Sequence, residues 1–125
     1  MNFRNLALFT ALVYCALALI WALAPNILLS TWGVDFSYST GLVGRRNAAL
    51  LAGLGIMLFQ ARAAQPSPAR SAMVSGLIFA NIALACLGIV ELTTGHAQLG
   101  ILVAVIGEFA LGVAFIYVGR KPSPQ

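Results

Sequence analysis

The chain has 125 residues, of which 61% are hydrophobic and 8% are charged, and its formal net charge is +4. Soluble domains carry about 25% charged residues, so this composition excludes a soluble globular domain and indicates an integral membrane protein. The positive charge does not indicate nucleic-acid binding, because the seven Lys and Arg stand singly or in pairs near the ends of apolar runs.

Four apolar runs are long enough to cross a bilayer, which takes roughly 20 residues of helix. We expect spans at about residues 3–24, 41–63, 69–91 and 97–118, in one domain. The first run contains a signal-peptidase-like Ala22-Leu23-Ala24, but it is longer than a signal peptide, so we expect a retained helix. Short connections predict an all-α membrane protein with four transmembrane helices in an up-down-up-down bundle. Residues 25–38 mix apolar and polar side chains, which predicts a short interfacial segment between the first two spans.

The orientation of the bundle follows from its Lys and Arg residues. One side holds Arg4, Arg62, Arg70, Arg120 and Lys121, and the other holds only Arg45 and Arg46. The positive-inside rule then predicts a multi-pass membrane protein with both termini in the cytoplasm.

Each span has one helical face that carries a polar residue among small ones. Tyr14 lies on such a face of the first span, Asn81 on the third and Glu108 on the fourth. On the second span we expect the inward face to consist of Gly41, Arg45, Ala49, Ala52, Gly53, Ile56 and Gln60. At 1.5 Å per residue, Tyr14, Asn81 and Glu108 each fall roughly 15 Å below the outer ends of their helices, so we expect them in one plane.

These positions predict a polar shaft in the outer half of the bundle. Its mouth consists of Arg45, Arg46 and Glu91, and its base of Tyr14, Asn81 and Glu108; these six are the candidate ligand-binding residues. Arg45 would anchor an anion or reach Glu108, while Glu91 could hold Arg45 or Arg46 at the rim. A purely structural alternative stays open, because polar side chains also join membrane helices, at about 0.6 kcal/mol on average.

No metal or cofactor is expected. His96 is the only histidine in the chain, and a metal site needs several ligands. Cys15 and Cys86 lie inside spans, where we interpret them as small apolar residues and not as a disulfide.

Two short stretches resemble a known group of proteins. They are Ala24-Pro25-Asn-Ile-Leu-Leu-Ser-Thr-Trp32-Gly33, followed by Gly44-Arg45-Arg46-Asn47 and a Gly- and Ala-rich helix ending in Ala61-Arg62. This half of the chain is similar to small bacterial four-helix membrane proteins of DoxX-like and related uncharacterised families. The resemblance implies a four-helix fold and assigns no role to Glu108.

Three classes of function remain open. The first is a protein that binds a hydrophobic or anionic ligand, or serves as an accessory subunit of a larger membrane complex, with membrane lipid around it. The second is a membrane isomerase or hydrolase of a lipid-like substrate, in which Glu108 is the general acid or base and Tyr14 assists it. The third is a proton-coupled small transporter, which would need a homodimer to form a pathway.

Overall fold

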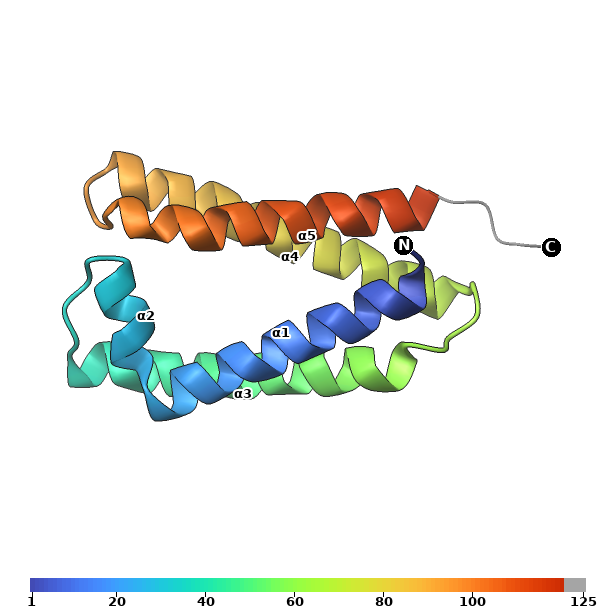
Figure 1. The fold of residues 1–125 in the computed structure, drawn as a ribbon, viewed down its shortest axis with the longest axis horizontal. Coiled ribbons are helices and arrows are strands. Elements are labelled where there is room, and N and C mark those ends of the chain that lie inside the picture. The colour runs from blue at the N-terminus through green and yellow to red at the C-terminus, as the bar shows by residue number, and fades with distance from the viewer. Residues whose placement is uncertain (121–125) are drawn as a thin grey trace.

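Four long helices form the molecule, and each is long and apolar enough to cross a membrane. The computed structural model describes residues 1–120. The helices are α1 (Phe3–Leu23), α3 (Tyr38–Ala61), α4 (Pro68–Thr93) and α5 (Leu102–Arg120), which follows the short 3-10 helix η1 (Leu99–Ile101) (Figure 1). The prediction of an all-α, four-helix membrane protein is therefore confirmed.

Capping side chains account for where two of the helices begin. Ser37 and Thr40 form a capping box, so α3 begins at Tyr38, three residues before the expected start. The Ser67 side chain accepts a hydrogen bond from the Arg70 amide at 3.1 Å, and Pro68 takes the first helical position of α4. Both caps satisfy backbone donors at an end of a span.

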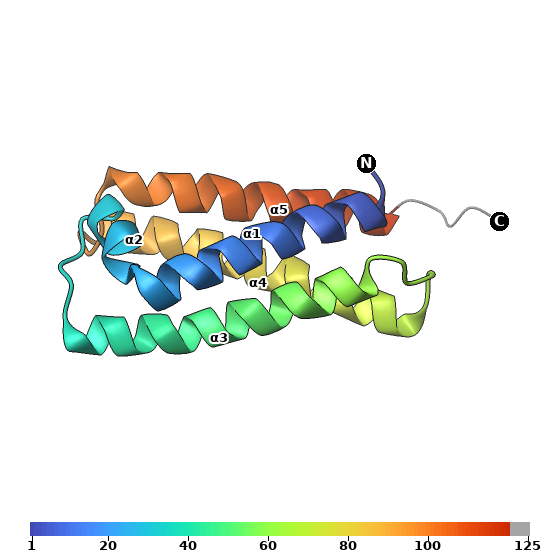
Figure 2. The ribbon, with the colours of Figure 1, turned by 60° about the horizontal axis from the view of Figure 1, so that its bottom comes forward.

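The expected interfacial segment is the two-turn helix α2 (Pro25–Thr31). Its C-terminal end is attached to the start of η1: the Gln98 amide donates to the Trp32 carbonyl at 2.8 Å. Gly100 lies so close to Thr31 that a Cβ there would overlap the Thr31 carbonyl oxygen. In Figures 1 and 2, α2 lies across the end of the bundle opposite the chain's N-terminus. We call the end with α2 the outer end and the end with the N-terminus the inner end.

The four spans are arranged as two pairs. Helix α1 packs chiefly on α3, and α4 packs chiefly on α5. The two pairs meet in the inner half of the bundle, where a buried cluster draws on all four helices. That cluster consists of Phe3, Leu6, Ala7, Ala11, Tyr14, Leu58, Val74, Leu77, Phe115 and Val118.

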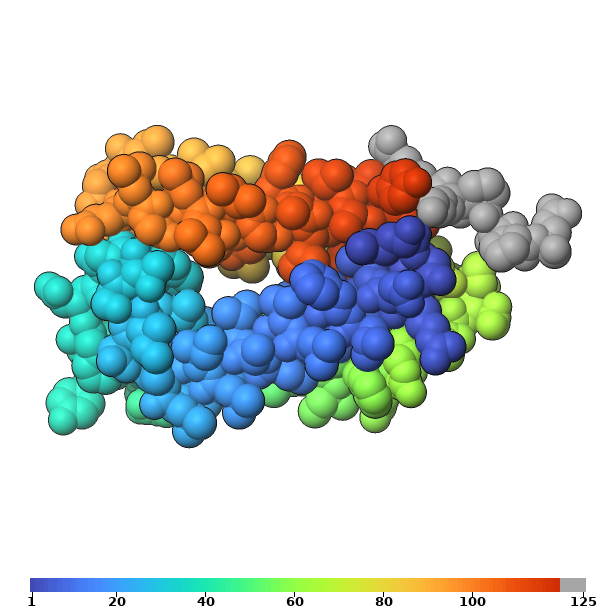
Figure 3. Space-filling view, in the orientation of Figure 1, coloured from blue at the N-terminus to red at the C-terminus, as the bar shows by residue number. Residues whose placement is uncertain are grey.

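The pairs separate toward the outer end, where α2 links them (Figures 1 and 2). The close contacts there stay within a pair, between Gly44 and Trp21 or between Gly88 and Val105. In the space-filling view an opening lies between α5 and the middle of α1, bounded by α2 (Figure 3). We call this opening the intramembrane cleft. Its apex is the level at which the two helix pairs meet.

The α3–α4 connection and the end of α5 lie at the inner end with the N-terminus, as alternating helices require (Figure 1). Arg4, Arg62 and Arg70 all border that end. Lys121, which also contributed to the predicted orientation, lies outside the described residues.

The predicted inward face of α3 is wrong apart from Gly41, which is buried as expected. Ala49, Gly53, Ile56 and Gln60 are exposed, and the buried residues are Gly41, Gly44, Ala48, Gly55 and Leu58. The physical reason is the close approach of α1, since a Cβ on Gly44 would lie 2.6 Å from Cε3 of Trp21. Small residues decide which face of a membrane helix packs, and here they turn Arg45 outward.

Candidate functional site

The base of the site is a hydrogen bond between two helix pairs. The amide nitrogen of Asn81 on α4 donates to the Tyr14 hydroxyl of α1 at 2.9 Å and to the Leu77 carbonyl at 2.9 Å. Asn81 is 1% exposed and Tyr14 is 7% exposed. The predicted inward faces of α1 and α4 are confirmed, and these two residues do share one level in the bundle.

Glu108 lies on the inward face of α5, between the buried residues Val105 and Gly112. Gly112 is level with Asn81, because a Cβ on Gly112 would lie 3.7 Å from the Asn81 Cβ. Glu108 is four residues, or about 6 Å, nearer the outer end, so it lies one turn above the expected plane. It remains within electrostatic reach of Tyr14.

Glu108 is only half-buried although it faces inward. It is also not part of the buried cluster in which the two helix pairs meet. The carboxyl group has no hydrogen bond or ion pair with any residue that the structure describes. The hydrogen-bonding capacity of this carboxyl group is therefore unused within residues 1–120.

The Tyr14–Asn81 pair also has hydrogen-bonding capacity left over. The Tyr14 oxygen accepts a bond, so its own proton remains available as a donor. The Asn81 side-chain oxygen receives no hydrogen bond from residues 1–120. This oxygen is not fully enclosed by the protein. One donor, one acceptor and one carboxyl group thus lie near the apex of the cleft.

The two arginines predicted at the mouth of the shaft lie apart from this group. Arg45 and Arg46 are both exposed. The Arg45 guanidinium folds back toward the outer end of α3, where its Nη1 would lie 3.4 Å from a Cβ on Gly41. Arginines near the end of a membrane helix extend toward the interface in this way. The structure therefore directs Arg45 toward Gly41 at the outer end of α3 and not toward Glu108.

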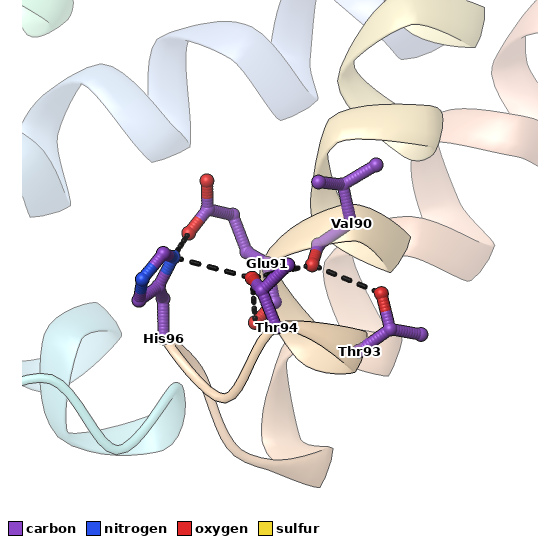
Figure 4. Close-up of polar contacts among 5 residues, drawn as sticks. All are labelled: Val90, Glu91, Thr93, Thr94 and His96. Carbon is purple, nitrogen blue, oxygen red and sulfur yellow. Dashed lines mark hydrogen bonds and ion pairs between the residues drawn. The ribbon is translucent and has the colours of Figure 1, made fainter.

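Glu91 is paired with a residue of its own loop. Its Oε2 lies 2.9 Å from Nδ1 of His96, which also lies 3.2 Å from the Thr94 hydroxyl (Figure 4). The His96 side chain is 70% exposed and the Glu91 side chain 46% exposed, so the pair belongs to the surface of the α4–α5 turn. Neither Arg45 nor Arg46 contacts Glu91, and the predicted rim of arginines around this carboxylate is not formed.

One buried polar group was not singled out from the sequence. Thr10 is fully buried one turn from Tyr14 toward the inner end, and its hydroxyl has no hydrogen-bond partner among the described residues. Its place on the same helical face as Tyr14 was visible in the sequence, but a threonine in a membrane helix usually bonds its own backbone.

Within residues 1–120 there is no group of three His, Cys, Asp or Glu side chains that could hold a metal ion. Cys15 and Cys86 are exposed free thiols on different helices.

Comparisons of the chain with protein-family models, with curated proteins and with solved structures give no match. The resemblance to DoxX-like proteins thus stays a prediction from the two stretches in the first half of the chain.

Proposed function

We propose that this protein binds an uncharged, elongated apolar molecule with a polar head group inside the intramembrane cleft. Tyr14, Asn81 and Glu108 would hold the head group, and the apolar chain would extend between the helix pairs toward lipid. The single observation that carries this proposal is the unused hydrogen-bonding capacity of these three side chains near the middle of the bundle.

The cost of unsatisfied polar groups supports the proposal. Away from water, a polar group without a partner costs roughly 1–3 kcal/mol, and more if it is charged. Glu108 is a half-buried carboxyl group within a helix that is long and apolar enough to cross a membrane, where lipid tails would offer no partner. A ligand hydroxyl can accept from Tyr14 and donate to Asn81 or Glu108, which satisfies the groups at once.

The charged side chains near the cleft favour a ligand with an uncharged head group over one with an anionic head group. Arg45 and Arg46 are exposed near the outer surface of α3, and no other cationic side chain lies near Glu108 among the described residues. An anionic head group would meet the Glu108 carboxyl without a counter-charge, which burial makes costly. A hydroxyl-bearing lipid, such as a long-chain alcohol, fits this cleft better than an anion does.

The proposed setting is the inner membrane of a bacterium, with both termini in the cytoplasm. The concentration of arginines at the inner end supports this orientation through the positive-inside rule.

A photoaffinity experiment tests the binding proposal. The purified protein in detergent is exposed to a long-chain primary alcohol that carries a diazirine in its alkyl chain, or to the alkane of the same length with the same diazirine. We expect the alcohol to label α1 and α5 in preference to the alkane. The variant Glu108→Leu should lower alcohol labelling roughly 2- to 10-fold, which is the value of one hydrogen bond.

The matched control is Phe109→Leu, which changes the exposed neighbour on the outward face of α5. It should leave labelling unchanged, and thermal unfolding of both variants would verify that they are folded. Equal labelling by alcohol and alkane, or an equal loss in the two variants, would show that the cleft does not recognise a polar head group.

A further inference from the structure

A second concave site lies at the inner end of the bundle, far from Glu108. It is a pocket of about 710 Å³ between the start of α1, the α3–α4 connection and the end of α5. Three arginines line it: Arg4 from α1, Arg62 from the end of α3 and Arg70 from the first turn of α4. These residues are distant in the sequence and are brought together only by the fold.

Two of the three guanidinium groups are held in place by the protein. Arg70 lies over the Phe3 ring at 4.0 Å and donates from Nη1 to the Ala64 carbonyl at 3.0 Å. Arg62 lies over the Phe59 ring at 4.0 Å, and its Nη1 donates to the Phe59 carbonyl. Aromatic stacking orients a guanidinium without using its in-plane donors. Each group therefore keeps N–H donors that can bind an acceptor.

No acidic side chain neutralises this cluster. The chain contains three acidic residues. Asp35 and Glu91 belong to the outer end, and Glu108 does not line this pocket. Arg4 is exposed and makes no hydrogen bond or ion pair with the described residues. The pocket is therefore positively charged, and no acidic side chain of the protein balances this charge.

The rest of the lining is amphipathic. Ser71 and Ser75 add hydroxyl groups, whereas Phe3, Val74 and Val118 form an apolar wall that continues into the buried core. A ligand that fits has a phosphate at the membrane surface and an acyl chain that follows the apolar wall inward. Basic pockets between membrane helices bind anionic lipid head groups through this combination.

We propose that this pocket binds the phosphodiester head group of an anionic phospholipid in the leaflet at the inner end. Arg62 and Arg70 are the oriented donors, and Arg4 supplies the third positive charge of the lining. The proposal is independent of the ligand in the intramembrane cleft, because the two sites share none of their polar residues.

Native mass spectrometry of the full chain, released from detergent, tests this site. The probes are dioleoyl phosphatidylglycerol, which is anionic, and dioleoyl phosphatidylcholine, which has the same acyl chains and no net charge. We expect phosphatidylglycerol to bind more tightly. Each of Arg62→Gln and Arg70→Gln should weaken its binding about fivefold, as expected for one arginine at a membrane surface.

Two further variants separate binding from folding. Arg4→Gln removes no hydrogen bond or ion pair with the described residues, so it tests the site even if Arg70→Gln destabilises the chain. Arg45→Gln is the matched control, because it removes an equally exposed arginine at the opposite end. The control should leave phosphatidylglycerol binding unchanged, whereas Arg4→Gln should weaken it.

Two results would overturn the proposal. The first is equal binding of the two lipids, or an equal effect of Arg45→Gln and the pocket variants, which would indicate nonspecific attraction. The second is displacement of the lipid by millimolar glycerol 3-phosphate, with this soluble probe retained by the protein. That result would assign the pocket to a free phosphate compound.

Discussion

The packing of Gly55 against α1 provides the sharpest test of how α3 is turned in the bundle. A Cβ at this position would lie 2.6 Å from Sγ of Cys15 and 3.2 Å from the carbonyl oxygen of Ala11. A Cβ on Gly53, two residues earlier on the same helix, would meet no neighbouring atom within 4 Å. Gly55→Ala and Gly53→Ala therefore make the same chemical change in opposite surroundings.

The expected difference follows from two opposing effects. Alanine stabilises a helix by about 0.5–1 kcal/mol relative to glycine, and both variants gain this. Forcing a methyl group into a packed interface costs about 1–3 kcal/mol, and this cost applies only to Gly55→Ala. Because both variants gain the same helix propensity, only the packing cost distinguishes them. Gly55→Ala should therefore be less stable than Gly53→Ala by about 1–3 kcal/mol.

Unfolding by sodium dodecyl sulfate in mixed micelles measures this difference. Trp21 and Trp32, whose ring centroids are 5.6 Å apart, provide a fluorescence signal for loss of the native fold. Adding Cys15→Ala should restore much of the stability lost in Gly55→Ala, because the removed sulfur is the nearest clashing atom. If Gly53→Ala proved the more damaging change, α3 would be turned as the polar pattern suggested, and Arg45 would face inward.

Two other predictions concern the base of the cleft and the attachment of α2. A double-mutant cycle of Tyr14→Phe and Asn81→Ala, measured with the same unfolding assay, should give a coupling energy of about 0.6 kcal/mol. This is the average for hydrogen bonds between membrane helices. A coupling energy of zero would contradict the observed bond. Gly100→Ala should destabilise the protein by at least about 1 kcal/mol, because its methyl group would overlap the Thr31 carbonyl oxygen. Gly107→Ala should not destabilise the protein, because a Cβ on Gly107 would have open space around it. A similar loss of stability in the two variants would mean that α2 is not packed on η1.

Helical periodicity predicted part of the candidate site correctly. The faces of α1 and α4 each carry one polar residue within a continuous row of small or apolar ones, so Tyr14 and Asn81 were placed inward at one level. On α3 the same reasoning failed, because glycines occur on two faces and only one is used. A Cβ on Gly44 or Gly55 would overlap side-chain atoms of α1, whereas a Cβ on Gly53 would meet no atom of the described residues within 4 Å. A single sequence does not distinguish these faces, since the choice depends on the neighbouring helix.

The sequence by itself determined the class of protein, the number of spans and the residues that must avoid hydrocarbon. Each of these features depends only on the length and composition of one segment, because a long run of apolar residues is most stable as a helix across a bilayer. Only the tertiary structure decided that the helices form two pairs that separate at the outer end, that Arg45 leaves the interior, and that Arg4, Arg62 and Arg70 share a pocket. Those outcomes arise from contacts between segments far apart in the chain, where close approach at small residues outweighs the periodicity of any one helix.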